Sequence, residues 1–322
     1  MEYRTLAQTD LKVSRVCLGT MTFGKQTDEA TAARMVEMCL DAGINFLDTA
    51  NVYSGGASEE ILGRMLGGRR QEIVLASKAG SLGGKPPRGP RLRRGQIVAE
   101  AEKSLRRLRT GYLDLYYLHQ PDYETPMDES LAALEELVHA GKVRHTATSN
   151  FASWQVAEAL AIAGSRGYRP PAAAQQMYNV LNRRLEPEFV PMAEALKVSI
   201  LVYNPLAGGL LTGKHRPGEP TAGTRFDGNK EYQRRYWKQT QFDAVEDVRK
   251  LSDRCGRSMV DISLSWLLHH TAADCVILGA SKLEHLEQNL AACEAGPLPE
   301  AVLNGLDDVW RRVGGVAANY NR

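Results

Sequence analysis

Four polar side chains of the kinds that move protons follow short β-rich runs in the first half of the sequence. They are Asp48, Tyr53, Lys78 and His119. A phenol has a pKa of about 10, so it donates a proton poorly to a developing alkoxide unless a nearby cation stabilises its phenolate form. Lys78 could supply that cation, Asp48 could hold the ammonium in place, and His119 could orient and polarise a carbonyl by hydrogen bonding. The four residue types together predict general-acid catalysis on a carbonyl group, with Tyr53 as the proton donor.

The elements that must position these side chains alternate along the whole chain. Short apolar runs are followed by stretches with the apolar spacing of amphipathic helices, as expected of a parallel sheet wrapped by helices. Enzymes built on such barrels carry their reactive groups just after the strands. Eight strand-and-helix units without a break in composition predict one α/β domain over residues 1–322, a (β/α)8 TIM barrel. The expected strands are Arg15–Leu18, Asn45–Asp48, Ile73–Ser77, Leu113–Leu118, Val143–Thr148, Ala172–Gln176, Ser199–Val202 and Cys275–Leu278.

Three additions to the barrel are expected. Tyr3–Leu6 and Leu11–Val13 predict an N-terminal hairpin that covers the barrel floor. His215–Gln241 is predicted to be a long polar loop after the seventh strand, and Glu300–Val313 a C-terminal helix followed by a tail. The alternative architecture, an open doubly wound sheet, usually carries G-x-G-x-x-G after its first strand, and Leu18–Gly24 (LGTMTFG) lacks this motif. The closed barrel is therefore favoured.

Composition narrows the partners and the compartment. A net charge of +2 is too small to imply a polyanion partner, and the basic runs Arg88–Arg94 and Lys103–Arg109 lack the aromatic residues that nucleic-acid binding favours. Five cysteines without C-x-x-C predict neither disulfides nor a metal site. The chain has no apolar leader and no run of about 20 apolar residues. We therefore expect a cytoplasmic protein with no metal, no nucleic acid and no membrane segment.

Several segments strongly resemble the aldo-keto reductases. Asn45–Tyr53 (NFLDTANVY), Ala76–Lys78 (ASK) and Asp114–Asp122 (DLYYLHQPD) carry this resemblance. It implies that Asp48, Tyr53, Lys78 and His119 form the catalytic tetrad of that family. Further similar segments follow in the family's order along the chain: Thr148–Asn150 (TSN), Gln175–Asn179 (QQMYN), Tyr203–Lys214 (YNPLAGGLLTGK) and Leu278–Asn289 (LGASKLEHLEQN).

The resemblance implies an NADPH cofactor that lies extended across the barrel mouth without a Rossmann motif. Ser149, Asn150 and Gln175 would hold its carboxamide, and Tyr203 would stack on the nicotinamide ring. The glycines of Asn204–Lys214 would let backbone N–H groups approach the diphosphate closely. The remaining cofactor positions that the resemblance implies near the mouth are Met21, Asp48, Asn204, Leu206, Gly208, Leu210, Lys214 and Gly279.

The adenine end of the cofactor is expected at the helix after the eighth strand. Ser281 is predicted to open this helix, with Glu284 completing a capping box, and barrels often bind phosphate at such a helix N-terminus. Lys282 and Arg225 could add positive charge for a 2′-phosphate, which favours NADPH over NADH. The resemblance places further cofactor contacts on this helix at Gln288, Asn289 and His285, the last of which stands where the family often has Arg or Gln.

Within the family, the chain looks most like the aflatoxin aldehyde and succinic semialdehyde reductases. Arg235–Lys238 (RYWK), Leu286–Ala292 (LEQNLAA) and Asn319–Arg322 (NYNR) carry this closer likeness, together with Tyr203–Lys214. It implies small dicarbonyls, carboxylated aldehydes and aromatic aldehydes as substrates, a homodimer, and a substrate carboxylate held by Arg322. Because Arg322 also bears the chain's own α-carboxylate, and chain ends fray readily, an ordered position over the pocket is left open.

One alternative function comes from a second phosphate-binding pattern. Gly208–Lys214 matches G-x-x-x-x-G-K, seven residues of a P-loop. Position 215 is His, whereas a P-loop needs Ser or Thr there to hold Mg²⁺, and the strand order expected here is not doubly wound. A nucleotide triphosphatase is therefore disfavoured.

Two further alternatives use the same barrel. The potassium-channel β subunits resemble this chain and hold the cofactor with slow turnover, but they carry Asn where this chain has His119. A phosphate-binding isomerase with Lys78 as a Schiff-base amine would leave Tyr53, Asn150 and Gln175 without roles. The active carbonyl reductase accounts for more of the sequence than either.

Overall fold

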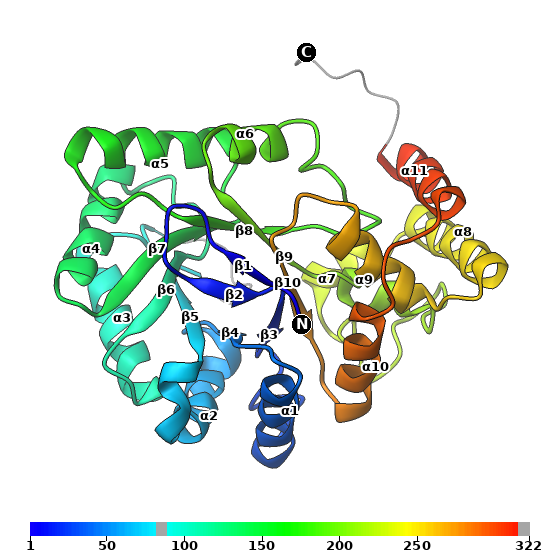
Figure 1. Ribbon diagram of the computed structural model, residues 1–322, viewed down its shortest axis with the longest axis horizontal. Helices are drawn as coiled ribbons and strands as arrows, with labels where there is room; N and C mark the ends of the chain where they lie inside the picture. Colours follow the sequence, from blue (N-terminus) through cyan, green and yellow to red (C-terminus); the bar gives the residue numbers. More distant parts are fainter. Residues whose placement is uncertain (82–88, 315–322) are drawn as a thin grey trace.

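The computed structural model describes residues 1–81 and 89–314, and within these ranges eight parallel strands close a barrel (Figure 1). Around the barrel the strands follow one another in chain order, and β10 pairs with both β9 and β3. The predicted (β/α)8 fold is confirmed, and each expected strand is present within two residues of its predicted ends. The strands are β3 Val16–Gly19, β4 Phe46–Asp48, β5 Val74–Ala79, β6 Leu113–Leu118, β7 Val143–Ser149, β8 Ala173–Met177, β9 Ser199–Tyr203 and β10 Cys275–Gly279.

The helices surround the barrel (Figure 1). They bury one apolar stripe each against the outward faces of the strands, as α1 does with Ala32, Met35, Val36 and Cys39. Their bounds are α1 Glu29–Asp41, α2 Ala57–Met65, α3 Arg94–Leu108, α4 Met127–His139, α5 Ser153–Arg166, α6 Phe189–Ala195, α7 Lys230–Tyr236, α8 Gln239–Cys255, α9 Met259–His269, α10 Leu283–Cys293 and α11 Glu300–Gly314. Three 3₁₀ segments are η1 Tyr53–Gly56, η2 Gly67–Glu72 and η3 Ala207–Thr212.

Side chains alternate between the barrel interior and the helix layer, as the period of a strand requires. In β6, Leu115 and Tyr117 belong to the interior cluster, whereas Tyr116 and Leu118 pack among the surrounding helices. The barrel interior is therefore a packed core, and it fixes the positions of the strands whose ends carry the polar side chains. Across the described ranges, no helix has the length and apolar content needed to cross a bilayer.

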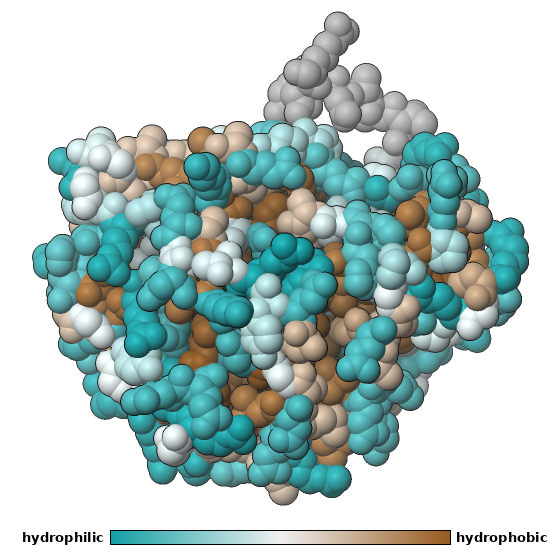
Figure 2. Space-filling model, viewed as in Figure 1, coloured by the Kyte–Doolittle hydropathy of each residue, from teal (hydrophilic) through white to brown (hydrophobic). Residues whose placement is uncertain are grey.

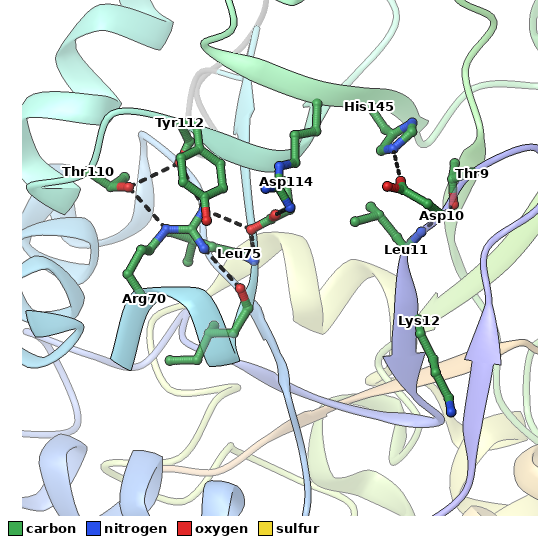
Figure 3. Close-up of polar contacts among 12 residues, drawn as sticks. Thr9, Asp10, Leu11, Lys12, Arg70, Leu75, Thr110, Tyr112, Asp114 and His145 are labelled. Carbon is green, nitrogen blue, oxygen red and sulfur yellow. Dashed lines mark hydrogen bonds and ion pairs between the residues drawn. The ribbon is translucent and has the colours of Figure 1, made fainter. Parts of the chain in front are cut away.

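The predicted N-terminal hairpin is present and covers the barrel floor. Strands β1 Tyr3–Thr5 and β2 Lys12–Ser14 pair antiparallel, and Leu6, Leu11 and Val13 join the interior core. In the turn, the carboxylate oxygen Oδ1 of Asp10 is hydrogen-bonded to Nε2 of His145 of β7 at 2.8 Å (Figure 3). In the space-filling view of this face, hydrophilic side chains cover most of the hairpin and the helix surfaces around it (Figure 2).

A second polar network ties the floor ends of β5 and β6 together. The Asp114 carboxylate accepts hydrogen bonds from Arg70 at 2.7 Å, from Arg144 at 3.1 Å and from the Leu75 amide at 2.9 Å. Both guanidinium groups lie over the ring of Tyr112, at 4.0 and 4.6 Å. These groups are fully engaged with one another at the end of the barrel opposite Asp48, so they belong to the framework of the fold.

Two expectations about local structure are wrong. The segment His215–Gln241 is not a polar loop throughout, because it contains α7 and the start of α8, and Phe226, Tyr232 and Tyr236 are buried. Because polar residues predominate in this segment, its average composition does not indicate the widely spaced aromatic residues that become buried. Ser281 does not open α10: the helix begins at Leu283, Lys282 is its N-cap residue, and no side chain caps it. Ser281 instead uses its carbonyl to accept a hydrogen bond from Thr27, which ties this segment to the loop after β3.

Helices α2 and α3 pack so closely at Gly63 that we expect a larger side chain there to destabilise the fold. A Cβ on Gly63 would lie 2.1 Å from the carbonyl oxygen of Arg107, so Gly63→Ala should lower the free energy of unfolding by about 1–3 kcal/mol through overpacking. Gly164 of α5 has open space around it, and Gly164→Ala should leave stability unchanged or raise it by up to about 1 kcal/mol. Urea unfolding measures both, and equal effects of the two substitutions would contradict the close packing.

Candidate active site

The carboxyl ends of β4, β5 and β6 bring Asp48, Lys78 and His119 to one mouth of the barrel. Asp48 is the last residue of β4, and His119 directly follows β6. Lys78 lies one residue inside β5 rather than closing it, because this strand continues to Ala79. Neighbouring parallel strands end at the same edge about 4.8 Å apart, so the three side chains can meet. Tyr53 reaches the same mouth from η1, which follows β4.

Lys78 and Asp48 form a buried ion pair. Their side chains are 0% and 2% exposed, and Nζ of Lys78 donates to Oδ1 of Asp48 and, at 2.8 Å, to the carbonyl oxygen of Thr49. The second carboxylate oxygen of Asp48 accepts a hydrogen bond from Gln175 at 2.9 Å. Buried charges are tolerated only when they are paired and hydrogen-bonded, as both of these are. These hydrogen bonds therefore hold Nζ of Lys78 in a fixed position.

The hydroxyl of Tyr53 also lies close to Nζ of Lys78. The two atoms lie 3.5 Å apart, and Nζ lies 5.1 Å from the centre of the phenol ring. The turn that carries Tyr53 has left-handed backbone at Ser54, Gly55 and Gly56, which glycine adopts without steric penalty. Ser54 secures this turn by donating to the carbonyl oxygen of Phe23 at 2.7 Å. The turn thus holds the phenol over the ammonium group.

The protonation states of this pair follow from burial and charge. Burial raises the pKa of Tyr53 above its usual range, and the positive charge of Lys78 opposes this shift without cancelling it. Burial by itself would lower the pKa of Lys78, but the charge of Asp48, with that of the phenolate form of Tyr53, raises it. At neutral pH the phenol is therefore protonated and the lysine is charged. Sequence reasoning considered the lysine alone, whereas the structure shows that burial has the larger effect on the phenol.

His119 faces Tyr53 across the mouth. The two rings meet edge to face with their centres 6.0 Å apart, and the His119 amide donates to the carbonyl oxygen of Ala79 at 2.8 Å. Burial, reinforced by the charge of Lys78, lowers the pKa of His119 well below its usual value, so the imidazole is neutral. In the part of the chain that the structure describes, its buried Nδ1 has no hydrogen-bond partner. A neutral imidazole keeps one N–H and can donate one hydrogen bond.

Side chains from β7, β8 and β9 complete the mouth. Ser149 and Gln175 are register partners at the ends of β7 and β8. The Asn150 amide group donates to Ser149 at 3.0 Å and to the carbonyl oxygen of His119 at 2.9 Å, and its oxygen accepts from Tyr203 at 2.6 Å. Asn150 has a left-handed backbone with φ 63°, which favours Asn among non-glycine residues. The structure therefore brings together the four residues expected around the nicotinamide.

The segment Asn204–Lys214 forms a tight loop that includes η3, and we refer to it, after the ligand expected there, as the nucleotide loop. Ala207–Gly209 are all left-handed, with φ of 49°, 71° and 102°. The amides of these three residues and of Leu211 donate within the loop, to Asn204 or to Leu206. These four amides are therefore already used, contrary to the simple expectation that the loop's N–H groups face a diphosphate. Leu210 is fully buried, whereas Leu206 is half-buried.

The predicted adenine end lies between the nucleotide loop and α10. Burial, together with the charges of Lys214 and Lys282, lowers the pKa of His285, so both ammonium groups act on one neutral imidazole. On the same helix, Gln288 is exposed and Asn289 is buried. Gly279, the last residue of β10, is exposed and has open space where a side chain would stand. Basic groups from two segments thus meet where a phosphate is expected.

Arg225 and Met21 lie side by side at another part of the mouth. Nη1 of Arg225 lies 3.1 Å from Sδ of Met21, and its guanidinium lies 5.4 Å from the centre of the Tyr232 ring. Met21 is 42% exposed, so this edge is open to a ligand. Arg322, predicted to hold a substrate carboxylate, lies outside the described residues.

Two residues near the mouth were missed by sequence reasoning as parts of the site. Tyr236 of α7 places its hydroxyl 3.2 Å from both Asn179 and Asn204, which anchors the start of the nucleotide loop. The charge of Arg235 lies close enough to Tyr203 to oppose the rise in the pKa of Tyr203 that burial causes. Three aromatic residues within six positions, Tyr232, Tyr236 and Trp237, are the signal that could have revealed this packed segment.

A closed (β/α)8 barrel with a phenol, a lysine, a carboxylate and an imidazole at its mouth has the layout of a barrel enzyme. The chain belongs to the aldo/keto reductase family, whose model matches residues 15–311. It is thus an oxidoreductase of a family that uses a nicotinamide cofactor, and the expected family is confirmed.

Individual relatives show how far the likeness extends. The chain is 40% identical to a rat (Rattus norvegicus) protein named aflatoxin B1 aldehyde reductase member 2, over 95% of this chain and 87% of the relative. It is 39% identical to the human protein of the same name, over 100% and 94%. It is also 33% identical to a rice (Oryza sativa subsp. japonica) protein named probable voltage-gated potassium channel subunit beta, over 94% of each chain.

The residues at the mouth fit a nicotinamide dinucleotide. Ser149, Asn150 and Gln175 present amide and hydroxyl groups beside Tyr203, and the buried Nδ1 of His119 still lacks a partner among the described residues. Basic groups stand at the far end of the nucleotide loop. Within residues 1–81 and 89–314, no group of three or more His, Cys, Asp or Glu side chains is arranged to hold a metal ion.

The buried ion pair predicts a characteristic pattern of stability. Lys78→Met should lower the free energy of unfolding by about 3–5 kcal/mol, because it leaves the Asp48 carboxylate charged and unpaired in the interior. Adding Asp48→Asn should recover most of that loss, since no unpaired charge then remains. Urea unfolding of both single variants and the double variant tests this. A double variant no more stable than Lys78→Met would refute the pairing argument.

Proposed function

We propose that this protein is an NADPH-dependent reductase of aldehydes and ketones with Tyr53 as the general acid. The observation that carries the proposal is the position of the Lys78 ammonium, between the carboxylate of Asp48 and the hydroxyl of Tyr53. Reduction of a carbonyl needs a proton at the oxygen as negative charge develops there. The protonated phenol supplies that proton, and the permanent, buried cation beside it stabilises the phenolate that remains.

His119 is proposed to position the carbonyl oxygen opposite Tyr53. Its imidazole is neutral and its ring faces the phenol, so an oxygen between them could accept hydrogen bonds from both side chains. Two donors converging on the oxygen fix the plane of the carbonyl and polarise it. Preorganised donors of this kind are effective because they need little rearrangement during the reaction.

The groups around Tyr203 are proposed to orient the cofactor. When bound, NADPH would supply the hydride that adds to the carbonyl carbon. Ser149, Asn150 and Gln175 would bind its carboxamide and so present one face of the nicotinamide to the substrate. Tyr203, whose hydroxyl is fixed by Asn150, would support the opposite face of that ring. Gln175 also bonds Asp48, so the cofactor and acid sites share one residue.

The preference for NADPH is proposed to come from basic groups at the rim. The charges of Lys214 and Lys282 both lower the pKa of His285, which supports a positively charged site for a 2′-phosphate of the adenosine near that residue. Arg225, beside Met21, adds a third charge at the mouth. A divalent phosphate gains more from such charges than the hydroxyl of NADH does.

The substrates are proposed to be small aromatic, dicarbonyl or carboxylated aldehydes. Relatives at 39–40% identity over most of this chain are named aflatoxin B1 aldehyde reductases, which supports an aldehyde substrate. The alternative is a channel subunit with slow turnover, because a relative at 33% identity is named a probable voltage-gated potassium channel subunit beta. The rate of turnover would distinguish the two functions. The neutral imidazole of His119, whose ring faces Tyr53, is the feature of this chain that favours active catalysis.

Removing one hydroxyl tests the mechanism. In Tyr53→Phe, kcat for the reduction of 4-nitrobenzaldehyde or succinic semialdehyde should fall by about 100-fold or more, because general-acid catalysis contributes at least that much. NADPH affinity, measured by fluorescence, should stay nearly unchanged. Tyr117→Phe is the matched control, since Tyr117 also lies near Lys78 but is fully buried in the barrel interior. Unchanged turnover in Tyr53→Phe would remove Tyr53 from the mechanism.

The cofactor preference has its own test. Arg225→Ala should weaken NADPH binding by about tenfold, the effect of losing one charge-assisted contact, and leave NADH binding unchanged. Fluorescence titration with each cofactor measures both affinities. Equal affinities for NADPH and NADH in the unmodified protein would overturn the proposed preference itself, whereas an unaffected Arg225→Ala variant would assign it to Lys214 and Lys282.

A further inference from the structure

The helix that follows Tyr53 opens with two buried polar side chains, Ser58 and Glu59. Helix α2 begins directly after the segment Tyr53–Gly56, which we call the Tyr53 turn, and both side chains are 0% exposed. A buried carboxylate is unfavourable unless it is paired and hydrogen-bonded, and a buried hydroxyl also needs partners. The partners of these two residues therefore show what the start of α2 is fixed against.

Ser58 is bonded to residues beside Asp48. Its hydroxyl donates to the carbonyl oxygen of Thr20 at 2.9 Å and shares a hydrogen bond with the Thr49 hydroxyl at 3.0 Å. Thr49 directly follows Asp48, and its carbonyl oxygen accepts the hydrogen bond from Nζ of Lys78. The first turn of α2 is thus attached to the end of β4, next to the buried ion pair of Lys78 and Asp48.

Glu59 is bonded to the residue beside Lys78. One of its carboxylate oxygens accepts a hydrogen bond from the hydroxyl of Ser77 at 2.5 Å. Ser77 precedes Lys78 in β5, and because side chains alternate along a strand, Ser77 faces the helices while Lys78 faces the barrel interior and mouth. Consecutive residues of α2 therefore contact the chain neighbours of the two charged residues that form the buried pair.

Arg107 of α3 pairs with Glu59 and lies against the Tyr53 turn. Its Nε donates to the second carboxylate oxygen of Glu59 at 2.6 Å. A Cβ on Gly56 would lie 3.1 Å from Cδ and 3.2 Å from Nε of Arg107, so the arginine packs directly on the last residue of the turn. Gly56 has a φ of 103°, which glycine adopts without steric penalty. The ion pair thus fixes a side chain against the turn that carries Tyr53.

Helix α3 also holds the chain on the other side of Tyr53. Glu100 accepts a hydrogen bond from the side-chain amide of Asn51 at 3.0 Å. Glu100 and Arg107 are seven residues apart, close to two helical turns, so they lie on the same face of α3. This face therefore contacts the chain both before Tyr53, at Asn51, and after it, at Gly56.

We propose that Glu59 and Arg107 are positioning residues for Tyr53, which hold its hydroxyl beside Nζ of Lys78. Their ion pair joins β5, α2 and α3 at one point, and the same arginine packs against the turn. Both residues act through the 3.5 Å distance between the phenol oxygen and the ammonium nitrogen, and neither contacts a reacting group. The inference rests on the proposed function, because it requires Tyr53 to be the proton donor.

The first test separates proton transfer from ligand binding. Glu59→Gln removes the charge that holds Arg107, so a single turnover of NADPH with 4-nitrobenzaldehyde should slow about tenfold, since a displacement of about 1 Å can cost about 100-fold. The solvent deuterium isotope effect on this step should increase, because protonation of the carbonyl oxygen becomes slower. NADPH affinity, measured by fluorescence, should stay unchanged. Ser77→Ala, which removes only one hydrogen bond to Glu59, should show the same changes to a smaller extent.

A double variant separates positioning from stability. Glu59→Gln leaves the guanidinium of Arg107, 22% exposed, without its carboxylate, so the melting temperature should fall. Adding Arg107→Met removes that charge and should recover most of the melting temperature. The single-turnover rate should stay low, because no ion pair then holds a side chain against Gly56.

Leu66→Ala is the matched control for loss of stability in α2. Leu66 is 3% exposed and follows the last residue of the helix, ten residues after Gly56. Its truncation leaves a cavity and should lower the melting temperature at least as much as Glu59→Gln does. Below that temperature, its single-turnover rate and isotope effect should equal those of the unmodified protein.

These outcomes are distinct from those that test the proposed function. If the unmodified protein does not reduce the aldehyde, or if Tyr53→Phe reduces it equally fast, the proposed function fails. If the unmodified protein is active and Glu59→Gln has the same rate and isotope effect, Glu59 does not position Tyr53. If the double variant regains its rate together with its melting temperature, or if Leu66→Ala slows the reaction equally, the ion pair acts through stability alone and the inference is overturned.

Discussion

The buried ion pair between Lys78 and Asp48 is the interaction on which the rest of the site depends. Neither charge is stable in the interior alone, and the carboxylate is satisfied only when Gln175 reaches it from β8, three strands beyond Lys78 in the barrel order. The folded barrel therefore supplies, from its far side, the hydrogen bond that completes the pair. Once formed, it holds a permanent positive charge beside Tyr53, and the proposed proton transfer uses that charge.

The two ends of the barrel serve different purposes. The floor is closed by the hairpin and by the Arg70 and Arg144 contacts to Asp114, in which the charged groups satisfy one another (Figure 3). At the mouth, among the described residues, left-handed Ser54, Asn150, Asn204 and Ala207 all follow strands that end there. Gln8 of the hairpin turn, Arg109 before β6 and Lys197 before β9 are left-handed as well, on the floor side. The mouth also holds unpartnered nitrogens at His119 and His215.

Sequence reasoning succeeded where a local pattern has one physical meaning. Alternating apolar runs identified all eight strands, and the residue types after them identified the four side chains that meet at the mouth. It failed where neighbours decide the outcome. The segment His215–Gln241 is polar in composition, yet Phe226, Tyr232 and Tyr236 are drawn into the core and α7 forms around them. Ser281 has the pattern of a helix cap, but α10 begins at Leu283, and the Ser281 carbonyl instead accepts a hydrogen bond from Thr27 of a distant loop.

The sequence by itself determined the architecture, the family and the chemical types at the mouth, because strand periodicity and side-chain chemistry are local properties. Only the tertiary structure decided how those groups behave. Burial, which depends on the whole barrel, raises the pKa of Tyr53 against the pull of Lys78 and keeps His119 and His215 neutral. The internal bonds of the nucleotide loop likewise depend on its folded shape, and they engage the amides of Ala207–Gly209 and Leu211 within the loop. Distances and desolvation are properties of the fold, so no spacing in the chain could have supplied them.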